Sequence, residues 1–188
     1  MTFLFYNQRE RSFFVDTPIC TGIQLKGGVD VEPILEEALR VSVKEAKKGM
    51  EDGKGGPFGA AIIKDGKIIA VSANTVLANH DATAHAEINA IREASKVLGT
   101  HDLSGCILYA TGFPCPMCLS AAIWANIKTI YYGCEACEAE EIGFRDDYIY
   151  RYLEDKHQNS DVLELQQFGH DVCKKLFAKY KEENKELY

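Results

Sequence analysis

The sequence predicts a three-layer α/β/α domain, in which a β-sheet is covered by helices on both faces. Two β-rich runs over residues 58–64 and 67–76 are joined by Asp65-Gly66, which is typical of a two-residue hairpin turn. Farther along, short apolar runs at residues 106–111 and 128–133 flank an expected helix, and strand, helix, strand is the pattern of a crossover unit. Amphipathic helices are expected before, between and after these strands, so both faces of the sheet can be covered.

Each of the first three helices has its own local signal. Residues 32–50 place apolar side chains three and four positions apart, with charges between them, and Pro33 suits the first turn. Residues 84–98 form the next expected helix, because Gly99 follows as a stop signal. The helix between the two later strands is expected over residues 116–126.

The two ends of the chain carry weaker signals. We expect broken helices over residues 138–156, a short strand over residues 161–166 and an amphipathic helix over residues 171–186. Residues 1–31 contain several aromatic side chains without a period, and we interpret them as an N-terminal extension. A chain of 188 residues is long enough for one well-packed domain, so residues 32–188 are expected to form a single domain.

The overall charge and hydropathy exclude several classes of protein. The formal net charge is −7, which argues against clamping many phosphates, so the expected partner is a small molecule rather than a nucleic acid. No apolar run approaches the ~20 residues that cross a bilayer, so no membrane association is expected. Residues 1–11 lack the basic start, apolar core and cleavage site of a secretory signal, which predicts a cytoplasmic protein.

Two short motifs have the spacing of a catalytic zinc site. His85-Ala86-Glu87 opens one expected helix, and Pro114-Cys115-Pro116-Met117-Cys118 opens another. One imidazole and two thiolates are ligands that zinc prefers, and three protein ligands leave the fourth position for water. The combination of His-x-Glu with Pro-Cys-x-x-Cys is the signature of the zinc nucleobase deaminases.

The helix starts suit the expected chemistry. Pro116 can occupy the first helical position, which places Cys115 at the helix entry and Cys118 in the first turn, where the helix dipole lowers thiol pKa values. Glu87 can lie beside the metal without binding it. We expect Glu87 to take a proton from the attacking water, pass it to a ring nitrogen and assist the departure of ammonia.

A second Cys-x-x-Cys pair leaves a rival interpretation open. Cys134 and Cys137 follow Cys118 at a spacing that also fits a four-cysteine structural zinc site. Such a chain would be a non-enzymatic zinc module that binds a partner. Against this interpretation, a helix end and a buried strand are expected between the two pairs and would hold them apart.

From about residue 32 to residue 188, the sequence resembles the bacterial guanine deaminases of the cytidine-deaminase superfamily. The resemblance depends on several stretches, which are Gly55-Gly56-Pro57-Phe58-Gly59-Ala60, Ile62-Ile63-Lys64-Asp65-Gly66, Thr83-Ala84-His85-Ala86-Glu87, Pro114-Cys115-Pro116-Met117-Cys118, Gly143-Phe144 with Asp146, Ile149-Tyr150 and Asn184-Lys185-Glu186-Leu187-Tyr188. It implies a catalytic domain with a cytidine-deaminase-like fold, a central mixed five-stranded sheet and one Zn²⁺ per subunit. It also implies a homodimer in which residues 160–188 are exchanged, so that Tyr188 reaches the partner's active site.

The same resemblance implies roles for residues around the base. Asp146 would bind the base and help to move protons, and Asn74 would hydrogen-bond the purine edge. The other implied substrate-binding positions are Phe58, Gly59, Ala60, Ala84, Pro114, Trp124 and Tyr188. Without the resemblance, Phe58 and Trp124 would be interpreted as core, Asn74 as a turn residue, Asp146 as a solvated charge and Tyr188 as a frayed end.

Three departures from the family pattern lie near the expected pocket. Gly112-Phe113 replaces the usual Cys-Glu, Asp81-Ala82 replaces the common Asp-Pro, and Arg145 stands where an acidic residue is usual. A guanidinium next to Asp146 could pair with it and alter what it recognises. These changes leave the zinc chemistry intact and leave the identity of the substrate open.

The predicted reaction is the conversion of guanine to xanthine and ammonia. Isocytosine, cytosine, guanosine and aminotriazines are alternative substrates for the same site. A tRNA adenosine deaminase shares the zinc motif but needs a basic surface for its RNA, which the acidic composition disfavours.

Overall fold

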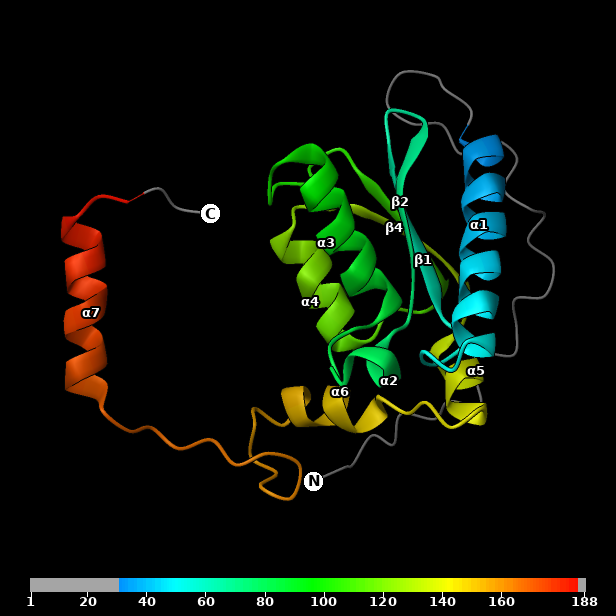
Figure 1. Cartoon of the computed structure of the whole chain (residues 1–188). Coiled ribbons are helices and arrows are strands. Elements are labelled where there is room, and N and C mark those ends of the chain that lie inside the picture. The colour runs from blue at the N-terminus through cyan, green and yellow to red at the C-terminus, as the bar shows by residue number, and fades with distance from the viewer. Residues whose placement is uncertain (1–30, 186–188) are drawn as a thin grey trace, which may run out of the picture.

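The computed structural model describes residues 31–185, which form a sheet covered by helices and a C-terminal helix that stands apart from it (Figure 1). The expected extension over residues 1–31 therefore lies outside the described residues except for residue 31. Tyr188 also lies outside them. Within the described part of the chain, no helix combines the length and the apolar character needed to cross a membrane.

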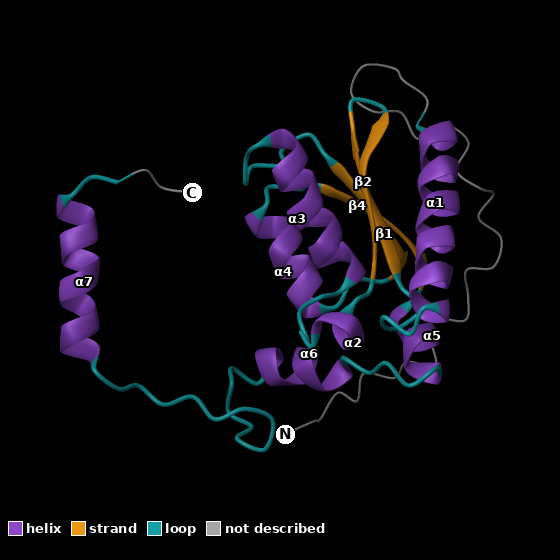
Figure 2. Cartoon of the chain, in the orientation of Figure 1, coloured by secondary structure: helices purple, strands orange, loops and turns teal. Residues whose placement is uncertain are grey.

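Four strands form the sheet, in the order β2-β1-β3-β4 (Figure 2). β1 (Gly59–Lys64) pairs antiparallel with both β2 (Lys67–Ala73) and β3 (Ile107–Gly112), and β3 pairs parallel with β4 (Thr129–Cys134). At the turn between β1 and β2, Asp65 and Gly66 both have positive φ, as a two-residue hairpin turn of type I′ requires. The hairpin prediction is confirmed.

Helices cover both faces of this sheet. α1 (Glu32–Glu51) lies on one face, and α3 (Ala86–Leu98) and α4 (Pro116–Trp124) lie on the other (Figure 2). β1 is buried on both sides because successive side chains of a strand point to opposite faces: Ala60 and Ile62 belong to the core cluster that includes residues of α3 and α4, whereas Ala61 and Ile63 belong to the one that includes Ala38 of α1. The three-layer prediction is confirmed.

The predicted fifth strand, over residues 161–166, is wrong. Residues 161 and 162 form a turn, residues 163–169 have no regular structure, and Leu163 and Leu165 are exposed. A strand needs a neighbour with which to exchange backbone hydrogen bonds, and this segment lies away from the sheet of its own chain (Figure 1). The remaining elements of residues 31–185 are the short helices α2 (Val76–Asn79), α5 (Ala136–Glu141) and α6 (Asp147–Glu154), and the longer α7 (His170–Glu182).

The directions of the strands bring several loops to one edge of the sheet. Because β1 is antiparallel to both β2 and β3, strands β2, β3 and β4 all run the same way. Their carboxyl ends at Ala73, Gly112 and Cys134 therefore lie along one edge, together with the start of β1 at Gly59. Ligand sites of open α/β sheets collect at the carboxyl ends of strands, so this edge is the place to look for a site.

Candidate active site

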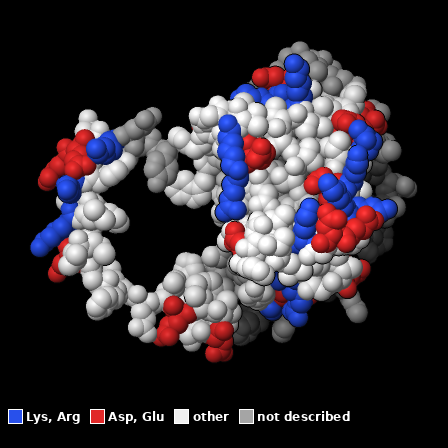
Figure 3. Space-filling view, in the orientation of Figure 1, with Lys and Arg blue, Asp and Glu red and all other residues white. Residues whose placement is uncertain are grey.

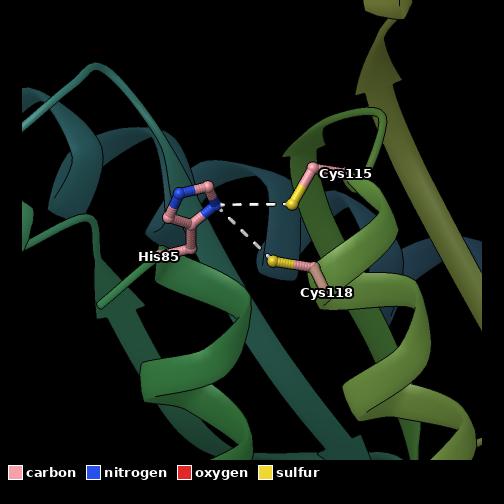
Figure 4. Close-up of side chains that lie close together, drawn as sticks. All are labelled: His85, Cys115 and Cys118. Carbon is pink, nitrogen blue, oxygen red and sulfur yellow. Dashed lines mark hydrogen bonds between the residues drawn. The ribbon is translucent and has the colours of Figure 1, made fainter. Parts of the chain in front are cut away.

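Three side chains with metal-ligand atoms converge at this edge (Figure 4). His85 is the N-cap residue of α3, Cys115 is the N-cap residue of α4, and Cys118 lies in the first turn of α4. The His85 Nδ1 atom is 3.6 Å from the Cys115 Sγ atom and 3.7 Å from the Cys118 Sγ atom. All three ligand atoms lie within 4.8 Å of one another.

These separations fit a zinc ion. Zn–S bonds of about 2.3 Å and Zn–N bonds of about 2.0–2.1 Å, at a tetrahedral angle, place nitrogen and sulfur about 3.6 Å apart. The two N-cap residues make this approach possible because their backbones are extended rather than helical, with ψ of 155° at His85 and 167° at Cys115. Each side chain can therefore turn away from its own helix and toward the facing one.

The thiols of Cys115 and Cys118 differ in pKa before a metal binds. The pKa of Cys115 is lowered to about 4, first by a hydrogen bond from the Cys118 thiol and then by His85. The pKa of Cys118 is raised, because its thiol donates that hydrogen bond and is buried. One thiolate is thus formed in advance, and metal binding would release the proton of the second thiol.

Glu87 lies beside this triad as the second residue of α3, and its side chain is buried. Burial raises the pKa of Glu87, with a further contribution from Cys115, and its carboxyl group shares a hydrogen bond with the Cys118 thiol. A raised pKa brings a carboxyl group closer to the pH at which it can both accept and release a proton. The position is suited to proton transfer next to a metal.

Asn74 follows β2 at the same edge and is buried. Its Oδ1 atom accepts the backbone N–H of Val76 at 3.1 Å, at the start of α2. Gly55 permits the close approach of the two loops, because a Cβ atom at Gly55 would lie 2.1 Å from Asn74 Oδ1. Among the described residues, nothing accepts a hydrogen bond from the Asn74 amide nitrogen, so this group can donate to a bound ligand.

An aromatic pair forms where the start of β1 meets the segment before α6. The rings of Phe58 and Phe144 pack edge to face, with their centroids 4.9 Å apart. Gly56 lies against both rings, because a Cβ atom there would be 2.8 Å from Phe144 and 3.1 Å from Phe58. Phe144 was not expected here; the signal that could have found it is its place in the stretch Gly143-Phe144.

Four of the predicted substrate-binding positions are buried and tightly packed. A Cβ atom at Gly59 would lie 2.1 Å from the Ser42 carbonyl oxygen of α1, so Gly59 allows strand and helix to approach. Ala60 belongs to the core cluster, and Ala84 and Pro114 are also fully buried. Ala84 and Pro114 directly precede the two N-cap ligands, which places their backbones at the site.

Trp124 is not brought to the site within this chain. It is the last residue of α4, and 74% of it is exposed. The nine residues of α4 span ~13 Å, so Trp124 and the ligand Cys115 lie at opposite ends of the helix. A position on the surface of the subunit therefore replaces the expected place in a wall around the base.

Asp146 precedes α6 and interacts electrostatically with the triad. It is the N-cap residue of α6, but its side chain makes no capping hydrogen bond. Partial burial and then the charge of Cys115 raise the pKa of Asp146, and Asp146 in turn raises the pKa of His85. The Asp146 carboxyl group is therefore close enough to Cys115 and His85 to act on them electrostatically.

Arg145 is directed away from Asp146. Its guanidinium lies 3.2 Å from a carboxylate oxygen of Glu140 and 3.5 Å from one of Asp147. The possible pairing of Arg145 with Asp146, which the adjacency of the two residues suggested, is therefore not formed.

Tyr150 of α6 is a further residue near the site that we did not expect. Its hydroxyl group lies 3.5 Å from the Pro114 carbonyl oxygen, in the loop that carries Cys115. Burial, followed by the charge of Asp146, raises the pKa of Tyr150 to about 12. The hydroxyl group therefore keeps its proton and can donate to this loop.

The second cysteine pair does not join the metal ligands. Cys134 and Cys137 are exposed, and His85, Cys115 and Cys118 are the only group of three or more suitable ligands in the described part of the chain. A capping box over Glu135 and Glu138 makes Glu135 the N-cap residue of α5, so the cysteines occupy different helix positions from Cys115 and Cys118. The four-cysteine interpretation is not supported.

The fold and the site together define a class of protein, the zinc-dependent hydrolytic deaminases. Residues 33–134, more than half of the chain, match the family model for the cytidine and deoxycytidylate deaminase zinc-binding region. The chain belongs to this family, and its cofactor is zinc.

Several characterised proteins are similar to this chain. Guanine deaminase from Bacillus subtilis (strain 168) is 50% identical over 119 residues, which are 63% of this chain and 76% of that enzyme. The crystal structure of guanine deaminase from Bacillus subtilis superposes with a TM-score of 0.73 at 41% identity, covering 81% of this chain and 98% of that one. The tRNA-specific adenosine deaminase of Aquifex aeolicus (strain VF5) is 43% identical over 98 residues, 52% of this chain and 64% of that enzyme.

Proposed function

We propose that the protein hydrolyses guanine to xanthine and ammonia. The observation that carries this proposal is the likeness to the Bacillus subtilis guanine deaminase, which extends over four fifths of the chain in the structural comparison. The likeness to the tRNA-specific adenosine deaminase covers only about half of the chain. The more extensive similarity favours the free base as the substrate.

In this proposal, each residue of the site has a defined task. His85, Cys115 and Cys118 would hold the zinc ion, which when bound supplies a Lewis acid that lowers the pKa of water at the site. Glu87 takes the proton of the attacking water and passes it to the ring nitrogen beside the attacked carbon. The same carboxylate then takes the proton of the hydroxyl group that has added to the carbon and gives it to the amine, so that the C–N bond breaks and ammonia leaves.

Recognition of the base is assigned to the residues around the triad. The amide nitrogen of Asn74 donates to an acceptor on the purine edge. The Phe58 ring supplies a surface against which a planar base can stack, and Phe144 fixes the orientation of that ring through their edge-to-face contact. Asp146, whose pKa is raised by partial burial and by the charge of Cys115, binds the base and assists proton movement.

The surface charge supports a small substrate rather than RNA. On the face of the molecule in Figure 3, Lys and Arg atoms are interspersed with Asp and Glu atoms and form no continuous basic field. The net charge of −7 also argues against RNA as the substrate, since binding to RNA depends largely on neutralising its phosphates. A tRNA substrate is therefore the second candidate.

Ammonia release from a panel of substrates tests the proposal. The panel contains guanine, guanosine, adenine, cytosine, isocytosine, an aminotriazine and a tRNA transcript. Guanine is expected to give the highest kcat/KM, with one xanthine formed for each ammonia released. A higher kcat/KM for tRNA or for a pyrimidine would overturn the assignment of guanine, and zinc binding without any turnover would favour the non-enzymatic zinc module.

We also propose that residues 32–188 form the catalytic domain of a homodimer, in which residues 160–188 are exchanged between subunits. Supporting this, α7 stands apart from the sheet of its own chain (Figure 1), and Val172, Leu176 and Phe177 expose apolar side chains on it. A helix with an uncovered apolar face is stable only when another surface buries it. In this arrangement Tyr188 completes the site of the partner subunit.

A complementation experiment tests the exchange. Deleting Leu187 and Tyr188 should lower turnover and leave the melting temperature nearly unchanged, because two terminal residues contribute little packing. Co-expressing that deletion variant with the Glu87→Gln variant should restore a substantial part of the activity, because the intact tail of the second chain completes the intact centre of the first. If the deletion leaves the rate unaffected, or if the mixed dimer stays inactive, the exchange is wrong.

The cytoplasm is the compartment that we propose. Cys134, Cys137 and Cys173 are free and exposed thiols. Exposed free thiols persist in a reducing compartment, which supports this assignment.

A further inference from the structure

Asn89, the fourth residue of α3, makes an unusual set of hydrogen bonds outside its own helix. Its Nδ2 atom lies 3.0 Å from the Ala73 carbonyl oxygen, 2.9 Å from Thr75 Oγ1 and 3.2 Å from the Ala84 carbonyl oxygen. The side chain is partly buried at this point. One amide group therefore faces three acceptors from two separate stretches of chain.

The acceptors flank two residues of the site. Ala73 and Thr75 lie on either side of Asn74, and Ala84 immediately precedes the metal ligand His85. The backbone closes the same loop, because the Thr75 N–H donates to the Ala84 carbonyl oxygen at 2.9 Å. Asn89 therefore connects the end of β2, the loop before α3 and α3 itself.

We propose that Asn89 is a positioning residue, which holds the base-recognising Asn74 in register with the metal ligand His85. This inference rests on the proposed function, because it takes Asn74 to be the group that contacts the substrate. Without Asn89, the backbone bond from Thr75 to Ala84 would be the one remaining hydrogen bond between residues 73–75 and residues 84–98 in the described part of the chain. Asn74 would then spend less time in the orientation that meets the base, and apparent affinity falls in proportion to the binding-competent fraction.

A purely structural role makes a different prediction. If the hydrogen bonds of Asn89 only stabilise the fold, their loss lowers the melting temperature but leaves the kinetics of the folded molecules unchanged. If Asn89 orients Asn74, its loss changes KM more than kcat, because the contact between Asn74 and the base exists in the ground state and in the transition state alike. The split between KM and kcat separates the two roles.

The sharpest variant is Asn89→Asp, which keeps the shape and replaces the donor with a carboxylate facing the Ala73 and Ala84 carbonyl oxygens. We expect KM to rise about tenfold while kcat stays within about threefold, in line with other losses of residues that orient a site. The matched control is Asn79→Asp. Asn79 also donates to Thr75 Oγ1, at 3.0 Å, but Asn79 is exposed and this hydrogen bond stays next to α2, so the KM of the Asn79→Asp variant should stay within about twofold of the wild-type value.

A double-mutant cycle tests whether Asn89 acts through Asn74. In an Asn74→Ala background, Asn89→Asp should change KM by less than about twofold, because the contact that it orients is already absent. An unchanged KM for Asn89→Asp, an equal rise in both backgrounds, or an equal rise for Asn79→Asp would each overturn the inference. If Asn89→Asp does not fold, Asn89→Ala, which introduces no repulsive charge, is taken through the same cycle with the same criteria.

The substrate for these measurements is whichever base the wild-type enzyme turns over fastest. Absence of wild-type guanine turnover counts against the proposed function alone, whereas the comparison between variants decides the role of Asn89. Zinc competition with a chelator provides a readout that does not depend on turnover. Asn89→Asp should release zinc more readily than Asn79→Asp, because the turn that carries His85 loses its tie to α3.

Discussion

Replacing Glu87 with glutamine is expected to lower kcat by about 10³-fold while zinc content and fold remain those of the wild type. Glutamine has the same shape, so the buried space beside the triad stays filled, but an amide cannot take a proton from water or return it to the amine. The side chain is buried and the pKa of its carboxyl group is raised by that burial, so the substitution also removes a desolvated acid. The melting temperature should therefore stay the same or rise.

The measurements for this variant are steady-state ammonia release, metal analysis and thermal melting. Glu93→Gln is the matched control, because Glu93 lies on the same helix, is exposed and pairs only with Lys96 among the ion pairs of the described residues. Its kcat should stay within about twofold of the wild-type value, as for most exposed substitutions. A Glu87→Gln enzyme that keeps more than about a tenth of the wild-type rate would contradict proton transfer by Glu87.

Replacing Cys118 with alanine is expected to abolish zinc binding and turnover together. The variant keeps two ligands, His85 and Cys115, and loses the sulfur 3.7 Å from His85 Nδ1, so zinc affinity should fall by about 10²-fold or more. Zinc stabilises only the folded chain, so its loss should also lower the melting temperature. Metal analysis after dialysis, with activity and melting measured on the same sample, checks the three effects.

Cys134→Ser is the matched control for zinc binding. It removes a thiol from the other Cys-x-x-Cys pair, which is exposed and lies outside the triad. One zinc per chain should remain and activity should be unchanged. Loss of zinc from Cys134→Ser would revive the four-cysteine site and remove the basis for a catalytic metal.

The zinc centre could be predicted from the sequence because its ligands depend on local structure. His85 and Cys115 each stand directly before a helix, and the glycine after Leu98 and the proline at position 116 mark where those helices end and begin. Glu87 and Cys118 then follow at fixed offsets within the first turn. The Asp65-Gly66 turn was predictable for the same reason, because positive φ at two successive residues restricts the choice of side chain.

The surroundings of the zinc centre could not be predicted in this way. Trp124 was expected beside the base but ends α4 on the surface, and Phe144 and Tyr150 approach the site from segments after β4. The segment expected to be a strand over residues 161–166 contains Val162, Leu163 and Leu165 but pairs with no strand of the described residues. Each of these outcomes depends on how distant segments pack, and apolar periodicity does not contain that information.

The sequence by itself determined the chemistry of this protein: two helix starts, a soft ligand triad and a neighbouring carboxylate, all fixed by spacings of one turn or less. Tertiary structure alone decided which groups surround that chemistry. Periodicity and spacing gave no place to Asn74, Asp146 or Asn89, and their positions follow from the parallel course of β2, β3 and β4 and from the return of α6 toward Pro114. The physical reason is that helix starts follow local backbone rules, whereas contacts across loops follow from the packing of the whole sheet.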